Sequence, residues 1–172
     1  MILSFLSIVI LIILSSIFTA SEQAMLAASD SMVVEDAEDG HKKARIVMRY
    51  QQHIKQFNVT IELMQMLIVL ITGGIALTTF NDDVNTWFNA EGSIFSILSM
   101  VIIAVILLIV IMVFGRLIPK RLANKNPHGV LYQTIGFVSF WIQLFKPFYA
   151  ILVYLSSLLG HLFNLKPDEG DR

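Results

Sequence analysis

Long apolar runs separated by short polar stretches dominate the pattern of this chain. The first run covers residues 1–20, the second 57–80 and the third 93–115, and the third has 23 residues without a charge. About 20 apolar residues in an α-helix cross the ~30 Å hydrocarbon core of a bilayer. The pattern therefore predicts an all-α membrane protein with three transmembrane helices.

The first run could also be read as a secretory signal peptide. No basic residue precedes it, and cleavage after Ala20 would put the bulky Phe18 at position −3, where a small residue is expected. We therefore expect residues 1–20 to remain in the protein as its first transmembrane helix.

The stretch between the first two spans is polar and charged. The acidic residues 35–39, followed by Gly40, predict a solvated turn. Residues 41–57 carry apolar side chains at helical spacing and five basic side chains on the remaining positions. This arrangement predicts a basic amphipathic helix that lies on the cytoplasmic membrane surface.

A fourth apolar stretch, residues 130–163, is broken by Lys146 and Pro147. Each half has about sixteen residues, which is short for a full crossing. We interpret the stretch as a broken apolar hairpin of two half-depth or surface helices; a kinked fourth span, which would carry the C-terminus outside, is the alternative. The chain is then a membrane domain, residues 1–165, followed by a polar tail, residues 166–172.

Basic residues are distributed unevenly among the polar stretches. Five lie between the first two spans, none in residues 81–92, and seven after the third span. Because loops rich in Lys and Arg stay on the cytoplasmic side, the N-terminus is predicted to be outside and the C-terminus in the cytoplasm. We expect a multi-pass protein of the plasma membrane, which in a bacterium is the inner membrane.

Composition supports the membrane assignment and narrows the function. The chain is 56% hydrophobic and 15% charged, with a mean hydropathy of +0.73, whereas soluble domains carry about a quarter charged residues. A net charge of −1 gives no reason to expect nucleic acid, and the absence of cysteine excludes disulfides. No nucleophile–base pair or phosphate loop is recognisable, so we expect no enzyme, and the lipid bilayer is the principal partner.

Polar side chains occur at helical spacing inside the first two spans. Ser15 and Thr19 lie four residues apart on one face of the first span, and Glu22 follows three residues later. Glu62 and Gln65 lie three residues apart in the second span. A carboxylate inside a membrane costs roughly 2.5–3.5 kcal/mol unless it is paired or hydrated, so Glu62 is either functional or solvated near the headgroups.

Two segments resemble motifs of the CorC/cyclin M family of divalent-cation transporters. Residues 15–24, which include Phe18-Thr19-Ala20-Ser21-Glu22, are similar to the family signature S-x-F-F-S-G-S-E-T-A. Residues 114–123 read F-G-R-L-I-P-K-R-L-A and are similar to F-G-E-x-x-P-K-x-x-A. Asn126-Pro127 and Lys146-Pro147 fall where the family also has Asn-Pro and a Pro. The likeness extends from about residue 15 to residue 163.

The resemblance implies a homodimer with three membrane helices and juxtamembrane helices on the cytoplasmic side. In the family, magnesium is held by hydroxyls of the first helix, an Asn of the second and a Glu of the third. The positions of this chain that match the ion site or flank it are Ser15, Thr19, Ser21, Gln65, Gly115 and Arg116. Family members usually continue into cytoplasmic CBS domains and a further C-terminal domain, and we expect this chain to consist of the membrane domain alone.

Arg116 stands where the family has its Glu. A guanidinium offers only hydrogen-bond donors and stays charged, so it would repel a magnesium ion, and we expect the site to be altered. Arg116 could instead form an ion pair with Glu62, unless each charge reaches separately toward water. We therefore expect ion transport or its regulation; the alternative is a non-transporting subunit, with the Glu62–Arg116 pair in place of the ion, that partners another membrane or cytoplasmic protein.

Overall fold

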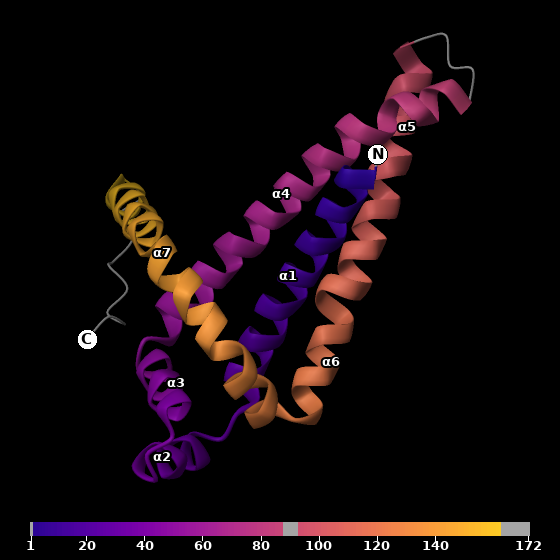
Figure 1. Ribbon diagram of the computed structural model, residues 1–172. Helices are drawn as coiled ribbons and strands as arrows, with labels where there is room; N and C mark the ends of the chain where they lie inside the picture. Colours follow the sequence, from indigo (N-terminus) through magenta and orange to yellow (C-terminus); the bar gives the residue numbers. More distant parts are fainter. Residues whose placement is uncertain (1, 88–92, 163–172) are drawn as a thin grey trace.

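The computed structural model describes residues 2–87 and 93–162, and this part of the chain consists of helices joined by short turns, with no strand (Figure 1). The predicted all-α fold is confirmed. The polar tail, residues 166–172, and the residues 88–92 of the predicted outer loop lie outside the described residues. The elements are α1 (Ile2–Ala27), α2 (Asp30–Glu38), α3 (Lys42–Gln52), α4 (Ile54–Trp87), α5 (Ser93–Val110), the π-helical segment η1 (Ile111–Leu117), α6 (Ile118–Lys125) and α7 (Pro127–Leu162).

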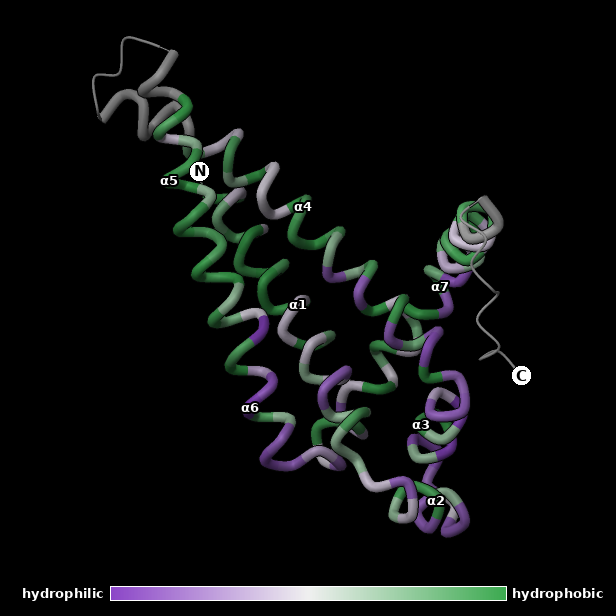
Figure 2. The backbone as a smooth tube through the Cα atoms, turned by 180° about the vertical axis from the view of Figure 1, so that it is seen from behind, coloured by the Kyte–Doolittle hydropathy of each residue, from purple (hydrophilic) through white to green (hydrophobic). Residues whose placement is uncertain are grey.

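Four helical stretches of the described chain are long and apolar enough to cross a membrane. They are Ile2–Ala27, Ile54–Phe80, Ile97–Lys125, which joins α5, η1 and α6, and Pro127–Leu159. The first three correspond to the predicted spans. Figure 2 shows hydrophobic residues along α1, α4 and α5, and hydrophilic residues on α2, α3 and the far end of α6.

The fourth stretch differs from the predicted broken hairpin. α7 is one helix of 36 residues with Pro147 inside it. Proline removes one N–H from the helix ladder, but a complete break would leave several backbone groups without partners in an apolar surrounding. The helix therefore continues through Lys146 and Pro147, as the alternative of a single fourth helix requires.

The segment between the first two spans also differs in detail from the prediction. The acidic residues 35–38 form the last turn of α2, and Gly40, whose φ of 93° favours glycine, follows the C-cap residue Asp39. The Gly40 and His41 N–H groups donate to the carbonyls of Ala37 and Asp36 at 3.3 and 3.0 Å, which is a Schellman-type helix end. The basic amphipathic helix is α3, and it is separated from α4 by His53 alone. The predicted outer loop is shortened because α4 continues to Trp87.

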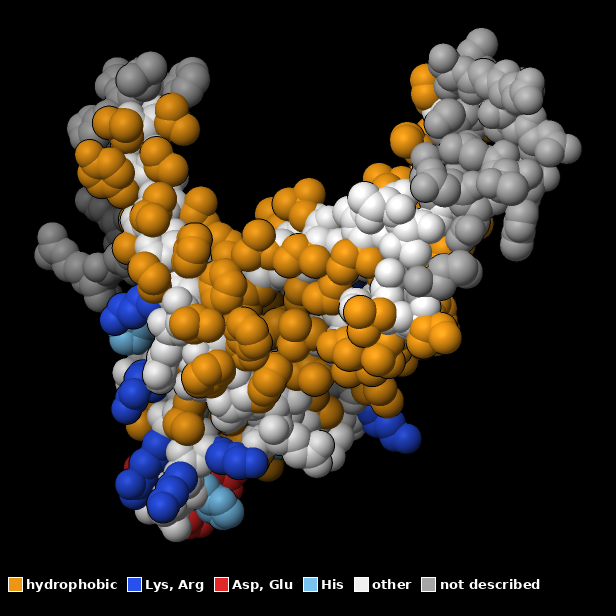
Figure 3. Space-filling model, turned by 45° about the horizontal axis from the view of Figure 1, so that its top comes forward, with side chains coloured by type: hydrophobic (Ala, Val, Ile, Leu, Met, Phe, Trp, Pro, Cys, Tyr) orange, Lys and Arg blue, Asp and Glu red, His pale blue; other side chains and the backbone are white. Residues whose placement is uncertain are grey.

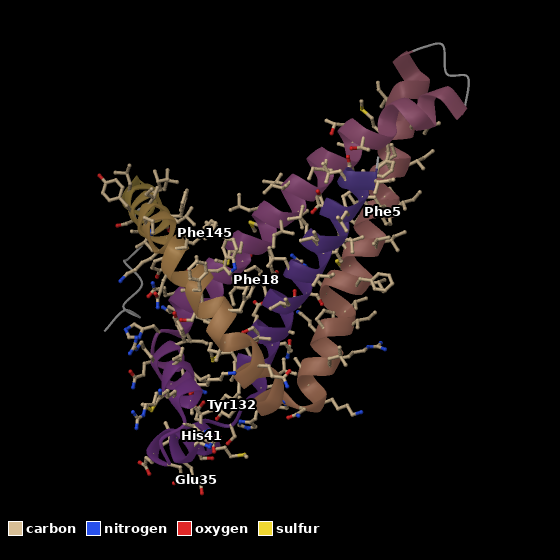
Figure 4. All side chains as sticks on the ribbon, viewed as in Figure 1. Phe5, Phe18, Glu35, His41, Tyr132 and Phe145 are labelled. Atoms are coloured by element: carbon tan, nitrogen blue, oxygen red, sulfur yellow. The ribbon has the colours of Figure 1, made fainter. Side chains whose placement is uncertain are left out.

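α1 is the central element of the molecule. It contacts α4, α7, η1 and α6, and Figure 1 shows it between α4 and the α5–α6 rod. The main apolar core surrounds its C-terminal half, where Phe18 is 1% exposed. Phe18, which is labelled in Figure 4, also meets Phe137 of α7 with 6.2 Å between the ring centroids. The core therefore encloses the part of α1 that carries Ser15, Thr19 and Glu22.

Side-chain hydrogen bonds attach α2 and α3 to α7. The Tyr132 hydroxyl donates to an Asp36 carboxylate oxygen at 2.6 Å, and the hydroxyls of Tyr50 and Ser139 are 3.0 Å apart. Figure 4 shows Tyr132 on the part of α7 that faces the α2–α3 pair. These bonds hold the first half of α7 against α2 and α3, while its second half extends away from them.

Candidate functional site

The polar face of α1 is enclosed by neighbouring helices. Ser15 and Thr19 are each 1% exposed, and Glu22, one turn further along, is partly buried. Residues four and three positions apart share one side of a helix, so the three side chains follow one another along α1. Because α4 and the η1–α6 segment cover this side, the hydroxyls and the carboxylate lie between helices.

Gln65 of α4 connects to this face through its amide group. Its side chain is 5% exposed, and Nε2 donates to Thr19 Oγ1 at 3.3 Å and to a Glu22 carboxylate oxygen, Oε2, at 3.2 Å. An amide nitrogen has two hydrogens, so both bonds can form at once. The structure thus brings together two predicted site residues, Thr19 and Gln65, and adds a carboxylate to them.

The third helix reaches the same face at Gly115. Ser15 Oγ lies 3.3 Å from the place that a Cβ atom on Gly115 would occupy, and the Ile111 Cγ2 atom lies at 3.6 Å. Such a contact is tight, so the absence of a side chain at residue 115 permits this close approach of the two helices. Ser15 and Gly115, both predicted site residues, are therefore neighbours.

Replacing Gly115 by valine is expected to lower the free energy of unfolding by roughly 1–3 kcal/mol, since the added methyl groups must displace Ser15 or Ile111. Thermal melting in detergent measures the change. Gly136→Val is the matched control, because an added Cβ at Gly136 of α7 meets nothing within 4 Å. Equal melting temperatures for Gly115→Val and wild type would show that the helices do not approach as described.

The backbone next to Gly115 is irregular. Residues 111–117 form a π-helix, and the Ile118 N–H donates to the Val113 carbonyl, five residues earlier. The next bond of this five-residue pattern would run from residue 119 to the Phe114 carbonyl, but residue 119 is a proline and has no N–H to donate. π-Helical turns are frequent at functional sites. The irregular turn therefore includes Gly115, the residue that contacts Ser15.

Three other predicted residues lie apart from this group. The Ser21 hydroxyl is buried and has no hydrogen-bond partner among the described residues. Glu62 is exposed although Gln65 is buried, because a separation of three residues turns the side chain about 60° around α4. Arg116 is partly exposed and forms no ion pair with any residue that the structure describes. The structure does not bring Glu62 and Arg116 together.

Glu22 is the site residue that the sequence interpretation left out. Its spacing from Ser15 and Thr19 places it on the same face, and this was the available signal. The contact with Gln65 depends on how α4 packs against α1, which no spacing within one helix reveals.

The site can accept hydrogen bonds from a cation or ligate it through oxygens. Its oxygens come from two hydroxyls, one amide and one carboxylate. No group of three His, Asp or Glu side chains that could hold a metal occurs in residues 2–87 and 93–162. Magnesium prefers rigid octahedral oxygen ligation, usually with carboxylates and retained waters, so this single carboxylate fits it only in part.

Comparison with known proteins adds independent findings. The sequence model of a family described as the cyclin M transmembrane N-terminal domain matches residues 6–172. A polyamine export protein of Haemophilus influenzae is 25% identical over 168 residues, which are 95% of this chain and 38% of that protein. A UPF0053 protein of Synechocystis is 24% identical over 167 residues, 93% of this chain and 36% of its own length. The chain thus spans less than two fifths of the length of these curated relatives.

Proposed function

Because the chain belongs to the cyclin M transmembrane-domain family, a family of membrane transport proteins, we propose that it carries a cation across the membrane through the site at Thr19, Glu22 and Gln65. The observation that carries the proposal is the Gln65 amide, which bridges the Thr19 hydroxyl and the Glu22 carboxylate between two apolar helices. Polar and ionisable groups inside membrane segments are costly, and they commonly mark ion and substrate pathways.

The amide of Gln65 can serve two states of the site. With no cation bound, its N–H groups donate to the Glu22 carboxylate and the Thr19 hydroxyl. A half-turn of the amide about its last side-chain bond would present the carbonyl oxygen instead. A cation between the helices would then meet the oxygens of Gln65, Thr19 and Glu22, and its departure would restore the two amide bonds.

The chemistry of these groups favours an organic ammonium ion as the cargo. Ammonium groups donate hydrogen bonds, and hydroxyl, amide and carboxylate oxygens accept them without requiring octahedral geometry. The Haemophilus influenzae relative is named as a polyamine exporter, so a polyamine is the first candidate. Magnesium, which the family resemblance implies, is the second candidate, because a site with a single carboxylate suits its octahedral ligation less well.

The regulatory alternative has less support. It includes an internal pair of Glu62 and Arg116 in place of the ion. In the described chain Glu62 is exposed and Arg116 has no ion-pair partner. Loss of the family Glu at position 116 still favours a non-transporting subunit.

Transport is tested directly with purified protein in liposomes. We expect labelled spermidine to enter these vesicles faster than it enters protein-free vesicles, and unlabelled spermidine to compete with it. Movement of magnesium but not spermidine would show that magnesium, the second candidate, is the cargo. No movement of either cation would favour the regulatory role.

The orientation proposed from the basic residues places the N-terminus outside and the C-terminus in the cytoplasm, so that α7 enters the bilayer without crossing it. Because the chain has no cysteine, each introduced cysteine is the single reactive thiol. We expect Asp82→Cys to react with an impermeant reagent from outside, and Lys125→Cys and Glu169→Cys only from the cytoplasmic side. Labelling of Glu169→Cys from outside would instead show that α7 crosses the membrane.

A homodimer in the plasma membrane, or the inner membrane of a bacterium, completes the proposal. Gly73 and Gly74 of α4 have nothing within 4 Å of an added Cβ, so this stretch of α4 is open to a second helix. Glycine pairs of this kind permit close helix packing in membranes. The mass in nanodiscs is the test, and a mass of one chain would contradict the dimer.

A further inference from the structure

A groove runs between the first turn of α4 and the second half of α7. Its volume is about 510 Å³. The α7 residues that line it recur at helical spacing, so they form one face of that helix. The lining residues are Gln56, Lys146, Tyr149, Ala150, Val153, Tyr154 and Ser157.

The part of α7 beyond Lys146 is built for a hydrocarbon surrounding. Its large apolar side chains are exposed on all sides of the helix, with Phe148 at 54%, Ile151 at 56% and Leu158 at 51%. A helix that is apolar all round lies in a core or in lipid, and here no core covers it. Figure 3 shows this apolar arm rising from the rest of the molecule.

Lys146 lies where this arm begins. It is exposed, and it is the single charged residue between residues 130 and 159. Further basic side chains follow on the cytoplasm-side helix α3, among them Lys42, Lys43 and Arg45. Figure 3 shows Lys and Arg side chains along the edge of the molecule below the arm. A positive edge that borders an apolar groove is complementary to a molecule with an anionic head and an apolar chain.

We propose that this groove binds one anionic phospholipid. The Lys146 ammonium pairs with the phosphate, and the Gln56 amide donates to the same headgroup. An acyl chain lies along Ala150 and Val153, which continue the lining face away from Lys146 by about 1.5 Å for each residue. The lipid thereby joins the second half of α7 to the start of α4, the helix that carries Gln65.

Lipid retention by the detergent-solubilised protein tests the proposal. Native mass spectrometry after addition of phosphatidylglycerol or phosphatidylcholine counts the lipids that each protein retains. We expect wild type to keep one phosphatidylglycerol in preference to phosphatidylcholine. Lys146→Gln should lower this occupancy about tenfold, because a charge-assisted bond to the phosphate is lost.

Two matched controls separate this site from general attraction to a basic surface. Lys43→Gln removes an exposed cation of α3 outside the groove and should retain wild-type occupancy. Ala150→Trp fills the groove and should abolish retention, whereas Ile151→Trp, on the neighbouring exposed face, should not. Equal losses in Lys43→Gln and Lys146→Gln, or full retention in both Lys146→Gln and Ala150→Trp, would overturn the proposal. Should Ala150→Trp fail to fold, the two lysine variants decide.

Discussion

Replacing Glu22 by glutamine is expected to slow cation transport by the reconstituted protein roughly 100-fold or more. Glu22 supplies the one carboxylate that contacts Gln65 in the site. A carboxylate and a cation about 4 Å apart attract by about 4 kcal/mol at an effective dielectric constant near 20, and each 1.4 kcal/mol corresponds to a factor of ten. Glutamine keeps the shape of the side chain and an oxygen that can accept from Gln65, so the fold should persist.

The measurement is the initial rate of spermidine uptake into proteoliposomes with equal amounts of protein. Glu35→Gln is the control, since it removes an exposed carboxylate from α2 and should transport at the wild-type rate. Melting temperatures of the two variants establish that both are folded. A wild-type rate for Glu22→Gln, with the protein folded, would show that the cation does not pass this carboxylate.

Replacing Arg116 by glutamate is expected to create a magnesium-dependent gain in stability that the wild type lacks. The change removes a positive charge next to Gly115, the residue that contacts Ser15, and puts a carboxylate at the position where the family has its Glu. A ligand that binds only the folded state raises its stability by about 2.7 kcal/mol at a concentration 100 times the dissociation constant. For a chain of this size that corresponds to an increase in melting temperature of roughly 5–10 °C.

Melting curves with and without millimolar magnesium measure this gain. Arg121→Glu makes the same charge change at an exposed position of α6 and should show no magnesium dependence. Arg116→Ala should leave stability nearly unchanged, because Arg116 has no ion-pair partner in the described chain. A magnesium shift already present in wild type, and lost in Ser15→Ala or Gln65→Leu, would restore magnesium as the cargo.

The sequence predicted those parts of the fold that depend on continuous apolar length. Each of the first three spans contains enough uninterrupted hydrophobic residues to require a helix in lipid, and the structure has these helices. The prediction was wrong where a local signal competes with helix continuation. Pro147 suggested a break in α7, but the cost of unpaired backbone groups in an apolar surrounding outweighs the single bond that proline removes.

The candidate site was predictable within each helix and not between helices. The spacing of Ser15, Thr19 and Glu22 follows from helix geometry alone. Which α4 residue faces them depends on how α4 is rotated against α1, and a shift of three residues changes an exposed Glu62 into a buried Gln65. Two charges of opposite sign at similar depth suggested the Glu62–Arg116 pair. Depth alone, however, does not bring two side chains to the same side of their helices.

The π-helical segment also changes which residues of the third span lie on the same side of the helix. In a continuous α-helix, Ala123 would lie about 120° and Pro119 about 80° around the axis from Ile111. One extra residue in the turn subtracts about 100°, so Pro119 and Ala123 each fall within about 20° of Ile111, on opposite sides of it, and all three are buried. Deleting one residue between 111 and 117 would therefore rotate the α6 side chains away from α1. The helical periodicity of buried positions therefore shifts by one residue between α5 and α6. The pattern of buried positions in one of these helices does not predict the buried positions in the other.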